Sequence, residues 1–186
     1  EEYNVPANLI HQVSQLSRQI FDVRKIAPNK KYTLLCDQQD SLKTARVLVY
    51  EPNQIDYIVF RFEDTLWVDV CKRDVVILEK SIAGEIRSNL SQTIEELGIS
   101  HELTNRFVDI FGWQVDFQRL QKGDKFKLIY EEAQVEGVSV GIKQINGIYF
   151  EHYGSPYYAI PFDQGEGPDY FDAEGNSLRK ALLKYP

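Results

Sequence analysis

The pattern of apolar and polar positions divides the chain into helical and strand-like stretches. Apolar residues within 6–21 recur at helical spacing, and Pro6 suits the first turn of a helix. From Lys31 the pattern becomes strand-like in four runs rich in β-branched and aromatic residues, KKYTLLCD, ARVLVYE, DYIVFRFE and LWVDVCK. Turn-forming residues separate these runs, so we expect an antiparallel meander that ends with DVVILEKSI near Ile82.

The second half of the chain repeats this order. The spacing of apolar residues predicts two further helices, which end at Gly98 and Gly112. Strand-like runs follow, namely KFKLIYEEAQ, VSVGIKQI, GIYFEHY and YYAIPFD. The Asn146-Gly147 pair between two of these runs predicts a hairpin turn.

Two segments 94 positions apart match each other locally. They are QIFDVRKIAPNKKYTLLCDQ at 19–38 and FGWQVDFQRLQKGDKFKLIYEE at 111–132. In this alignment Asp22 matches Asp116, and each aspartate lies between a helix and the first strand of a meander. An internal repeat explains the match, and chance similarity over so short a segment is the alternative.

These patterns together predict an α+β fold of two small modules. Each module has a helix, or a pair of helices, followed by an antiparallel β-meander. We expect the first module at 3–83 and the second at 84–170.

Charge and hydropathy exclude some classes of protein. A formal net charge of −7 argues against binding to nucleic acid, because neutralising phosphates requires a basic surface. No apolar run approaches the roughly 20 residues that a membrane span requires, so we expect none in this chain. The chain contains no methionine and opens at Glu1, and we therefore expect that a signal or anchor segment has been removed.

The residues that most often carry chemistry do not form a known motif. Cys36 and Cys71 lie in strand-like runs, where they are either a disulfide across neighbouring strands or two free thiols. The histidines His11, His101 and His152 lack the spacings of helical or strand-borne zinc sites. The sequence also contains no Walker, dinucleotide-binding or Gly-x-Ser-x-Gly motif. These features favour a scaffold or binding module over an enzyme.

Aromatic residues in the second half offer a possible binding surface. Trp113, Tyr153, Tyr157 and Tyr158 could together stack against sugar rings. The alternative is that these side chains pack in the core and across strands, which is the more frequent role of aromatic residues in strands.

The segment FGWQVDFQRLQKGDKFKLIYEE resembles the region that precedes the catalytic domain in lysostaphin/LytM-type zinc endopeptidases, the Gram-negative murein DD-endopeptidases. The similarity continues through SIAGEIRSNLSQTIEELGISHELTNRFVDIFGWQVDF and the tail YFDAEGNSLRKALLKYP, over 82–186. The segment DVRKIAPNKKYTLL resembles the first, inhibitory or wall-associated module of the family. The resemblance implies a non-catalytic N-terminal region, in which 171–186 is a linker that leads into the catalytic domain. The family's His-x3-Asp and His-x-His zinc motifs would lie beyond Pro186, and this chain would carry no catalytic residue and no cofactor.

The resemblance also implies a location and partners. The location is the periplasm or cell envelope, and the partners are peptidoglycan and the protein's own zinc-containing catalytic domain. In an autoinhibited arrangement a carboxylate of the first module occupies a metal position, and Asp22 is the candidate for this zinc-capping role. Capping of local backbone is the alternative role for Asp22. The alternative function is a stand-alone module that binds peptidoglycan or other envelope proteins.

Overall fold

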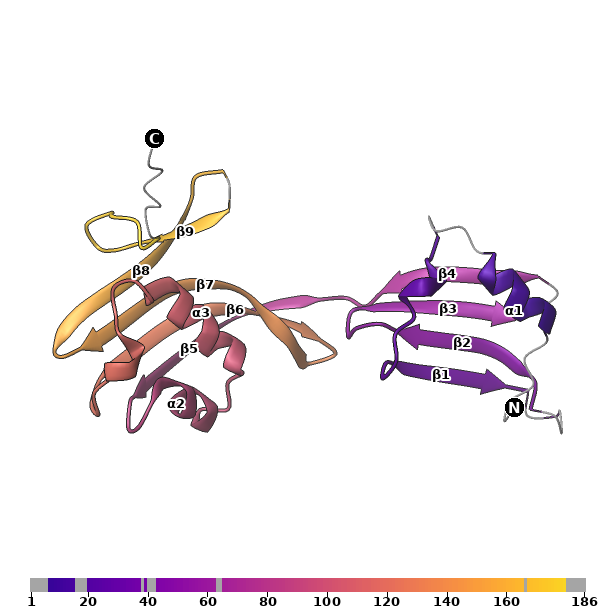
Figure 1. Ribbon diagram of the computed structural model, residues 1–186, viewed down its shortest axis with the longest axis horizontal. Coiled ribbons are helices and arrows are strands. Elements are labelled where there is room, and N and C mark those ends of the chain that lie inside the picture. Colours follow the sequence, from indigo (N-terminus) through magenta and orange to yellow (C-terminus); the bar gives the residue numbers. More distant parts are fainter. Residues whose placement is uncertain are drawn as a thin grey trace. The chain divides into compact units, whose positions relative to one another are not determined.

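The protein, seen here as a computed structural model, folds as two compact units, Glu1–Val75 and Val76–Pro186. The structure describes residues 7–15, 20–37, 39, 43–62, 65–165 and 167–179. Each unit combines short helices with one antiparallel sheet (Figure 1), which confirms the predicted α+β class with β-meanders. Among the described residues, no helix has the length and apolar character needed to cross a bilayer.

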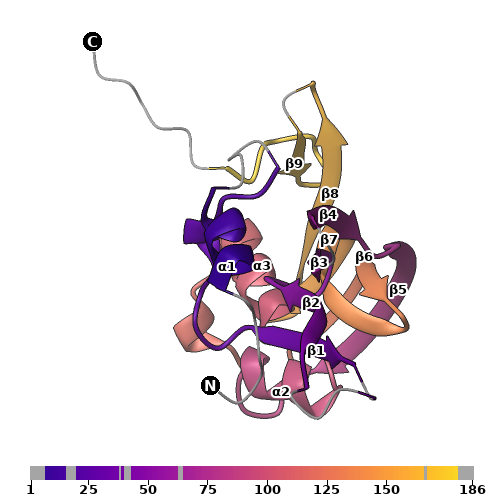
Figure 2. The ribbon, with the colours of Figure 1, turned by 90° about the vertical axis from the view of Figure 1, so that its right-hand side faces the viewer.

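The first unit is a four-stranded meander with a short helix on one side (Figure 2). The strands pair in chain order and are β1 (Lys31–Cys36), β2 (Ala45–Glu51), β3 (Asp56–Phe62) and β4 (Leu66–Lys72). Helix α1 (Ala7–Ser14) is shorter than the expected 6–21, and Ser14 Oγ donates to the carbonyl of His11 where it ends. Positions 16–19 lie outside the described residues. A small core forms beneath the helix, from Ala45, Tyr50, Ile58, Phe60 and Phe62.

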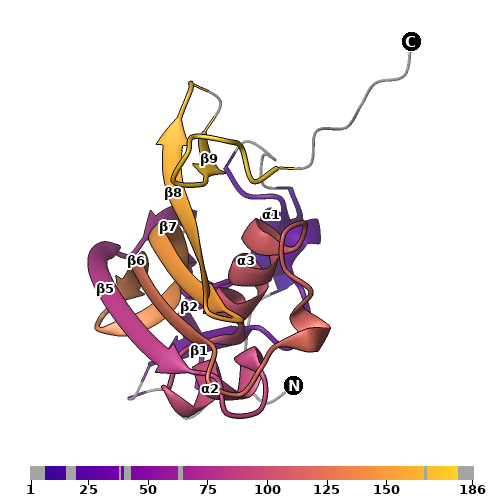
Figure 3. The same cartoon turned by 90° about the vertical axis from the view of Figure 1, so that its left-hand side faces the viewer.

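The second unit is a five-stranded antiparallel sheet with two helices on one face (Figure 3). Its strands also pair in chain order and are β5 (Val76–Glu85), β6 (Lys125–Val135), β7 (Val138–His152), β8 (Ser155–Asp163) and β9 (Pro168–Phe171). The helices are α2 (Leu90–Glu96) and α3 (His101–Phe111), close to the expected positions. Phe107 lies at the centre of the core, in edge-to-face contact with Phe117, Phe126 and Phe150.

The strand that we expected to close the first meander belongs to the second sheet. All ten residues of β5 pair with β6, from Val76 opposite Gln134 to Glu85 opposite Lys125. The division between units therefore falls after Val75, not near residue 83. A strand-like run shows that a strand forms, but it does not identify the partner.

The segment from residue 171 to 179 is part of the second unit and not a linker. Leu178 is only 4% exposed in the core, and its backbone N–H donates to the carbonyl of Tyr170 at 2.9 Å. Residues 180–186 lie outside the described part of the chain.

The Asn146-Gly147 pair does not form the expected hairpin. Strand β7 runs through it, and Asn146 is the extra residue of a β-bulge, because Ile129 pairs with Gly147 and Tyr130 pairs with Ile145. The two-residue turns are instead Glu136-Gly137 and Tyr153-Gly154, in which all four residues have positive φ.

The repeat seen in the sequence is present in the structure. Helices α1 and α3 begin 94 positions apart, as do strands β1 and β6. Between helix and strand, each unit has a short 3-10 helix at the same offset, η1 (Val23–Lys25) and η2 (Phe117–Arg119). The two units therefore share the succession of helix, 3-10 turn and first strand.

Candidate functional site

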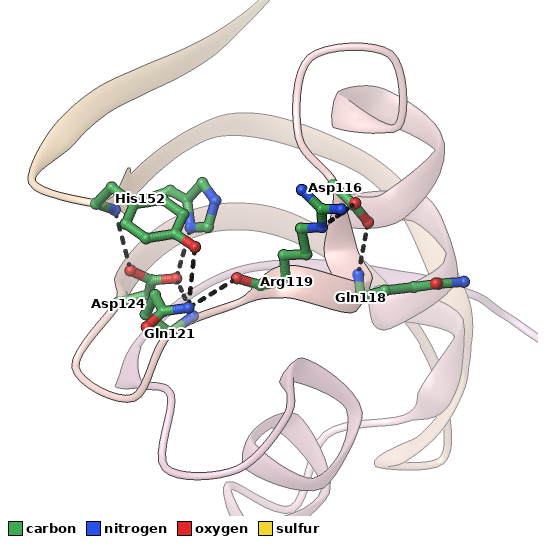
Figure 4. A network of polar contacts seen from close by, with 7 residues as sticks. Asp116, Gln118, Arg119, Gln121, Asp124 and His152 are labelled. Carbon is green, nitrogen blue, oxygen red and sulfur yellow. Dashed lines mark hydrogen bonds and ion pairs between the residues drawn. The ribbon is translucent and has the colours of Figure 1, made fainter.

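Polar side chains hold the corner between α3 and β6 (Figure 4). Asp116 caps η2, because its carboxylate accepts a hydrogen bond from the backbone N–H of Gln118 at 3.0 Å. The same carboxylate pairs with Arg119 at 3.3 Å. The side-chain amide of Gln121 donates to the carbonyl of Arg119 and to the hydroxyl of Tyr153. These contacts fix the chain as it leaves the helix and enters the sheet.

A buried pair, Asp124 and His152, lies at the same corner. His152 Nδ1 is 2.7 Å from Asp124 Oδ2, and the two side chains are 9% and 4% exposed. Asp124 also accepts hydrogen bonds from the backbone N–H groups of Gln121 at 2.8 Å and Tyr153 at 3.2 Å. The ring of His152 stacks on Phe150. The pair therefore joins the start of β6 to the β7–β8 turn, and burial of the carboxylate is offset by its hydrogen bonds.

Asp22 occupies the equivalent corner of the first unit. Its carboxylate caps η1 through the backbone N–H of Arg24 at 3.2 Å, and it also accepts from the guanidinium of Arg24 at 2.9 and 2.7 Å. Asp116 makes the corresponding cap in the second unit. To approach a metal, Asp22 would have to exchange its contact with Arg24, so its role as a zinc-capping carboxylate stays a prediction.

The two cysteines are free thiols. Cys36 lies on β1 and Cys71 on β4, which are the opposite edges of the first sheet. Three strand spacings separate these edges by about 14 Å. A disulfide requires Cα atoms within about 7 Å, so the two cysteines cannot bridge within one chain.

The described residues contain no group of three side chains that could hold a metal ion. The histidines lie in separate places. His11 is on α1 of the first unit, His101 begins α3 beside Ser91, and His152 is paired with Asp124.

Tyr157 and Tyr158 lie on opposite faces of the second sheet, because successive side chains of a strand alternate. Tyr157 packs against the core in contact with Phe111 and Phe150. Tyr158 lies on the other face, in T-shaped contact with Tyr149 at 5.5 Å between ring centroids. These two tyrosines therefore cannot belong to one binding surface.

Tyr158 instead borders a groove of about 520 Å³ on the second sheet. Two small residues, Ser81 on β5 and Gly147 on β7, lie on either side of Ile129 of β6 and line the groove, as do Tyr149 and Lys127.

Trp113 and Tyr153 are both exposed but have different surroundings. Each side chain is 64% exposed, and Tyr153 lies in the β7–β8 turn, where it accepts a hydrogen bond from Gln121. Trp113 follows the end of α3 and lines a groove of about 470 Å³ between that helix and β9.

The groove beside Trp113 combines an aromatic ring with charged groups. Asp109 lines it from α3, Asp169 lines it from β9, and Arg179 contacts the carboxylate of Asp169. The sequence predicted Trp113 as a binding residue from its residue type, and this role stays a prediction. It did not identify the charged residues, because they come from distant segments that only the folded sheet brings together.

A family model described as the Csd3 second domain matches residues 74–186. The chain is 30% identical over 131 residues to the peptidoglycan DD-endopeptidase ShyC of Vibrio cholerae, covering 70% of this chain and 30% of that protein. A zinc-containing peptidase from Vibrio cholerae has a similar fold, with a TM-score of 0.63 and 19% identity over 98% of this chain and 55% of that one. Helicobacter pylori Csd3, in its orthorhombic crystal, has a TM-score of 0.64 and 20% identity, covering 93% of this chain and 46% of that one. The chain thus spans about a third of the length of ShyC and about half of each structure.

Proposed function

Because the chain belongs to the family of the Csd3 second domain, we propose that it is the non-catalytic N-terminal region of a cell-envelope zinc endopeptidase. Membership confirms the resemblance to the N-terminal modules of LytM-type endopeptidases that the sequence indicated. In this proposal the parent protein hydrolyses peptide cross-links of peptidoglycan. The present chain restricts access of the substrate to the catalytic site or positions the substrate there. The observation that carries the proposal is the family match over 74–186, together with the similarity to a DD-endopeptidase.

The proposal assigns the zinc to a domain outside this chain. The described residues lack a set of metal ligands, so they do not fit a zinc site of their own. When bound in a catalytic domain, zinc lowers the pKa of a water molecule and thereby supplies the attacking hydroxide. The region that we describe would act on access to that site, in the periplasm or cell envelope where peptidoglycan is located.

Regulation requires two arrangements of the parent protein. In one, the first unit covers the catalytic cleft, with Asp22 as the candidate carboxylate near the metal. In the other, the first unit has moved away. The two units are separately packed, each with its own core, which supports movement of the first unit as one body.

The experiment that tests this proposal uses the parent protein and cross-linked muropeptides as substrate. We expect the coding sequence downstream to contain His-x3-Asp and His-x-His motifs. We also expect deletion of residues 1–75 to raise the rate of cleavage, because the unit that covers the cleft is then missing. The matched control deletes residues 1–179. If the first unit alone inhibits, the protein that lacks residues 1–75 and the protein that lacks residues 1–179 should cleave at the same raised rate. Absence of the zinc motifs, or an unchanged rate after deletion of 1–75, would contradict the proposal.

A second candidate function is a stand-alone module that binds peptidoglycan. The groove beside Trp113 favours it, because an exposed aromatic ring next to charged side chains suits a polar polymer. Retention of the chain on purified sacculi tests this function. It replaces the first proposal only if binding occurs and the parent protein carries no zinc motifs.

A further inference from the structure

We infer that the groove between α3 and β9 is a saccharide site that takes a β-linked chain of N-acetylated amino sugars. The inference rests on the proposed function, since such a chain is the glycan strand to which the peptides of peptidoglycan are attached. The groove would then hold the glycan part of the substrate, while the peptide cross-links are cut in the catalytic domain.

Trp113 provides the flat apolar surface that one face of a sugar ring requires. Its side chain is 64% exposed at the end of α3 and lines the groove. The axial C–H groups of a pyranose ring carry partial positive charge and are attracted to the electron-rich face of an indole. Trp113 follows the C-cap residue Gly112 of α3, a helix that is packed into the core through Ile110 and Phe111.

The floor of the groove is apolar and is formed by buried side chains. Ile110 and Leu178 line it, and they are 9% and 4% exposed as members of the core. Pro168 and the ring of Tyr170 border the same groove, and the hydroxyl of Tyr170 is held by the carbonyl of Ile145 at 3.1 Å. An acetyl methyl group can bury its apolar surface against such a floor, and side chains that are already packed in the core lose little entropy on binding.

The charged groups of the groove suit hydroxyl and amide groups rather than an anion. Asp109 and Asp169 offer acceptors, and Arg179 offers donors beside Asp169. The carboxylates outnumber the guanidinium, so the local charge disfavours a phosphate or a polyanion. A sugar presents both donors and acceptors, which matches a carboxylate and a guanidinium that already lie together.

The chain contains two tryptophans, and they provide a matched pair of reporters. Trp67 in the first unit is 63% exposed, nearly the same as Trp113, and it lies on β4, outside the groove. In a Trp67→Phe variant the fluorescence reports on Trp113, and in a Trp113→Phe variant it reports on Trp67. The probe is the soluble β-linked N-acetylglucosamine tetramer.

We expect the tetramer to shift the emission of the Trp113 reporter to shorter wavelength in a saturable way, because the ring is covered on binding. The Trp67 reporter should not respond. Calorimetry should show that Trp113→Ala binds the tetramer about tenfold or more weakly than the wild-type chain, because loss of a central aromatic contact typically has an effect of this size. Asp109→Asn should weaken binding less, while Trp67→Ala should leave it unchanged.

Several outcomes would overturn the inference. They are no response of the Trp113 reporter to the tetramer, an equal response of the Trp67 reporter, or a response of Trp113 to soluble stem peptides but not to the sugar. Circular dichroism of each variant tests whether a lost response comes from unfolding. Because both tryptophans are exposed, we expect their variants to fold. The proposed function fails separately, through the absence of zinc motifs in the parent protein. A saccharide response without those motifs would support the site and leave only the stand-alone wall-binding function.

Discussion

The corners at Asp22 and Asp116 have the same local structure, but the cores behind them differ. Each aspartate caps a 3-10 helix, and the two caps lie 94 positions apart. In the second unit Phe117 of that helix packs on Phe107 and Phe150 within a large aromatic core. The first unit has a small core of five buried residues, and its 3-10 helix contributes none of them. Local sequence therefore sets the corner, while the amount of buried apolar surface sets how strongly the unit is stabilised.

Removal of a central aromatic residue gives the largest expected effect. Phe107→Ala should lower the free energy of unfolding of the second unit by about 3–5 kcal/mol, because it leaves a cavity and removes several ring contacts. Urea unfolding followed by fluorescence in the Trp67→Phe background measures the second unit through Trp113. The same scan in the Trp113→Phe background should show an unchanged first unit, because the two units have separate cores.

The matched variant is Phe60→Ala, which removes a side chain only 1% exposed in the first unit. It should abolish the transition reported by Trp67 and leave the transition reported by Trp113 in place. A single transition that moves together for both reporters would show that the units do not unfold separately.

The buried pair gives the next largest effect and has no counterpart in the first unit. Asp124→Ala leaves His152 and the N–H groups of Gln121 and Tyr153 without their acceptor, and should destabilise the second unit by about 2–3 kcal/mol. The equivalent position in the repeat is Lys30, which is exposed. Lys30→Ala should therefore change the stability of the first unit by no more than about 0.5 kcal/mol.

Asp124→Asn is the second control for the pair. It keeps one acceptor oxygen in place and should be less destabilising than Asp124→Ala. Equal stability of Asp124→Ala and the wild type in urea would contradict the structural role of the pair.

Features that depend on contacts between residues close in the sequence could be predicted, and features that depend on distant strands could not. The corners were predictable, because Asp22 and Asp116 cap backbone only two residues away. The pairing of β5 with β6 and the bulge at Asn146 were not, since both depend on a partner strand distant in the chain. The Asn-Gly dipeptide indicates a turn only where the two flanking strands pair with each other.

The predicted binding residues follow the same rule. The aromatic residues were chosen by residue type alone, and only the fold decides that Tyr157 enters the core and that Tyr158 lies on the opposite face. Asp109 and Arg179, on the groove beside Trp113, had no local signal at all.

The two caps should have similar and moderate effects, which tests whether the corners are equivalent. Asp22→Ala and Asp116→Ala should each destabilise their own unit by about 1 kcal/mol, the usual effect of losing a cap. The ion pair of Asp116 with Arg119 adds little, because both side chains are more than half exposed. Urea midpoints of the two reporter backgrounds measure the difference. If only one of the two variants loses stability, the two corners share their backbone geometry but the caps do not stabilise them equally.

The same position tests the zinc-capping prediction for Asp22. Asp22→Asn keeps an acceptor for the cap but removes the negative charge that a metal would bind. In the parent protein it should raise the rate of muropeptide cleavage if Asp22 covers the metal. Asp116→Asn is the matched control and should not. An unchanged rate in Asp22→Asn would leave local capping as the whole role of this residue.

Acidification should have the smallest effect, and one mostly buried glutamate in each unit should contribute to it. Burial raises the pKa of Glu132, but hydrogen bonds from Lys80, Gln134 and Ser139 outweigh it, so the pKa lies below its ordinary value. The pKa of Glu51 in the first unit also lies below its ordinary value, because hydrogen bonds from Lys31 and Arg73 outweigh the effect of burial. A carboxylate whose pKa is lowered by folding stabilises the protein above its unfolded-state pKa of about 4.3, and this contribution is lost as the pH falls through the folded-state value.

The side chains of Glu51 and Glu132 are 12% and 11% exposed, so the comparison is closely matched. Glu132→Gln should reduce the loss of stability of the second unit between about pH 5 and 3, because the glutamine binds no proton in either state. The first unit should keep the full loss in this variant, and Glu51→Gln should give the converse. The measurement is the urea midpoint of each reporter background as a function of pH. If Glu132→Gln has the same dependence on pH as the wild type, other carboxylates control the acid sensitivity of the second unit, and the cross-strand contact with Lys80 at 2.5 Å does not contribute to it.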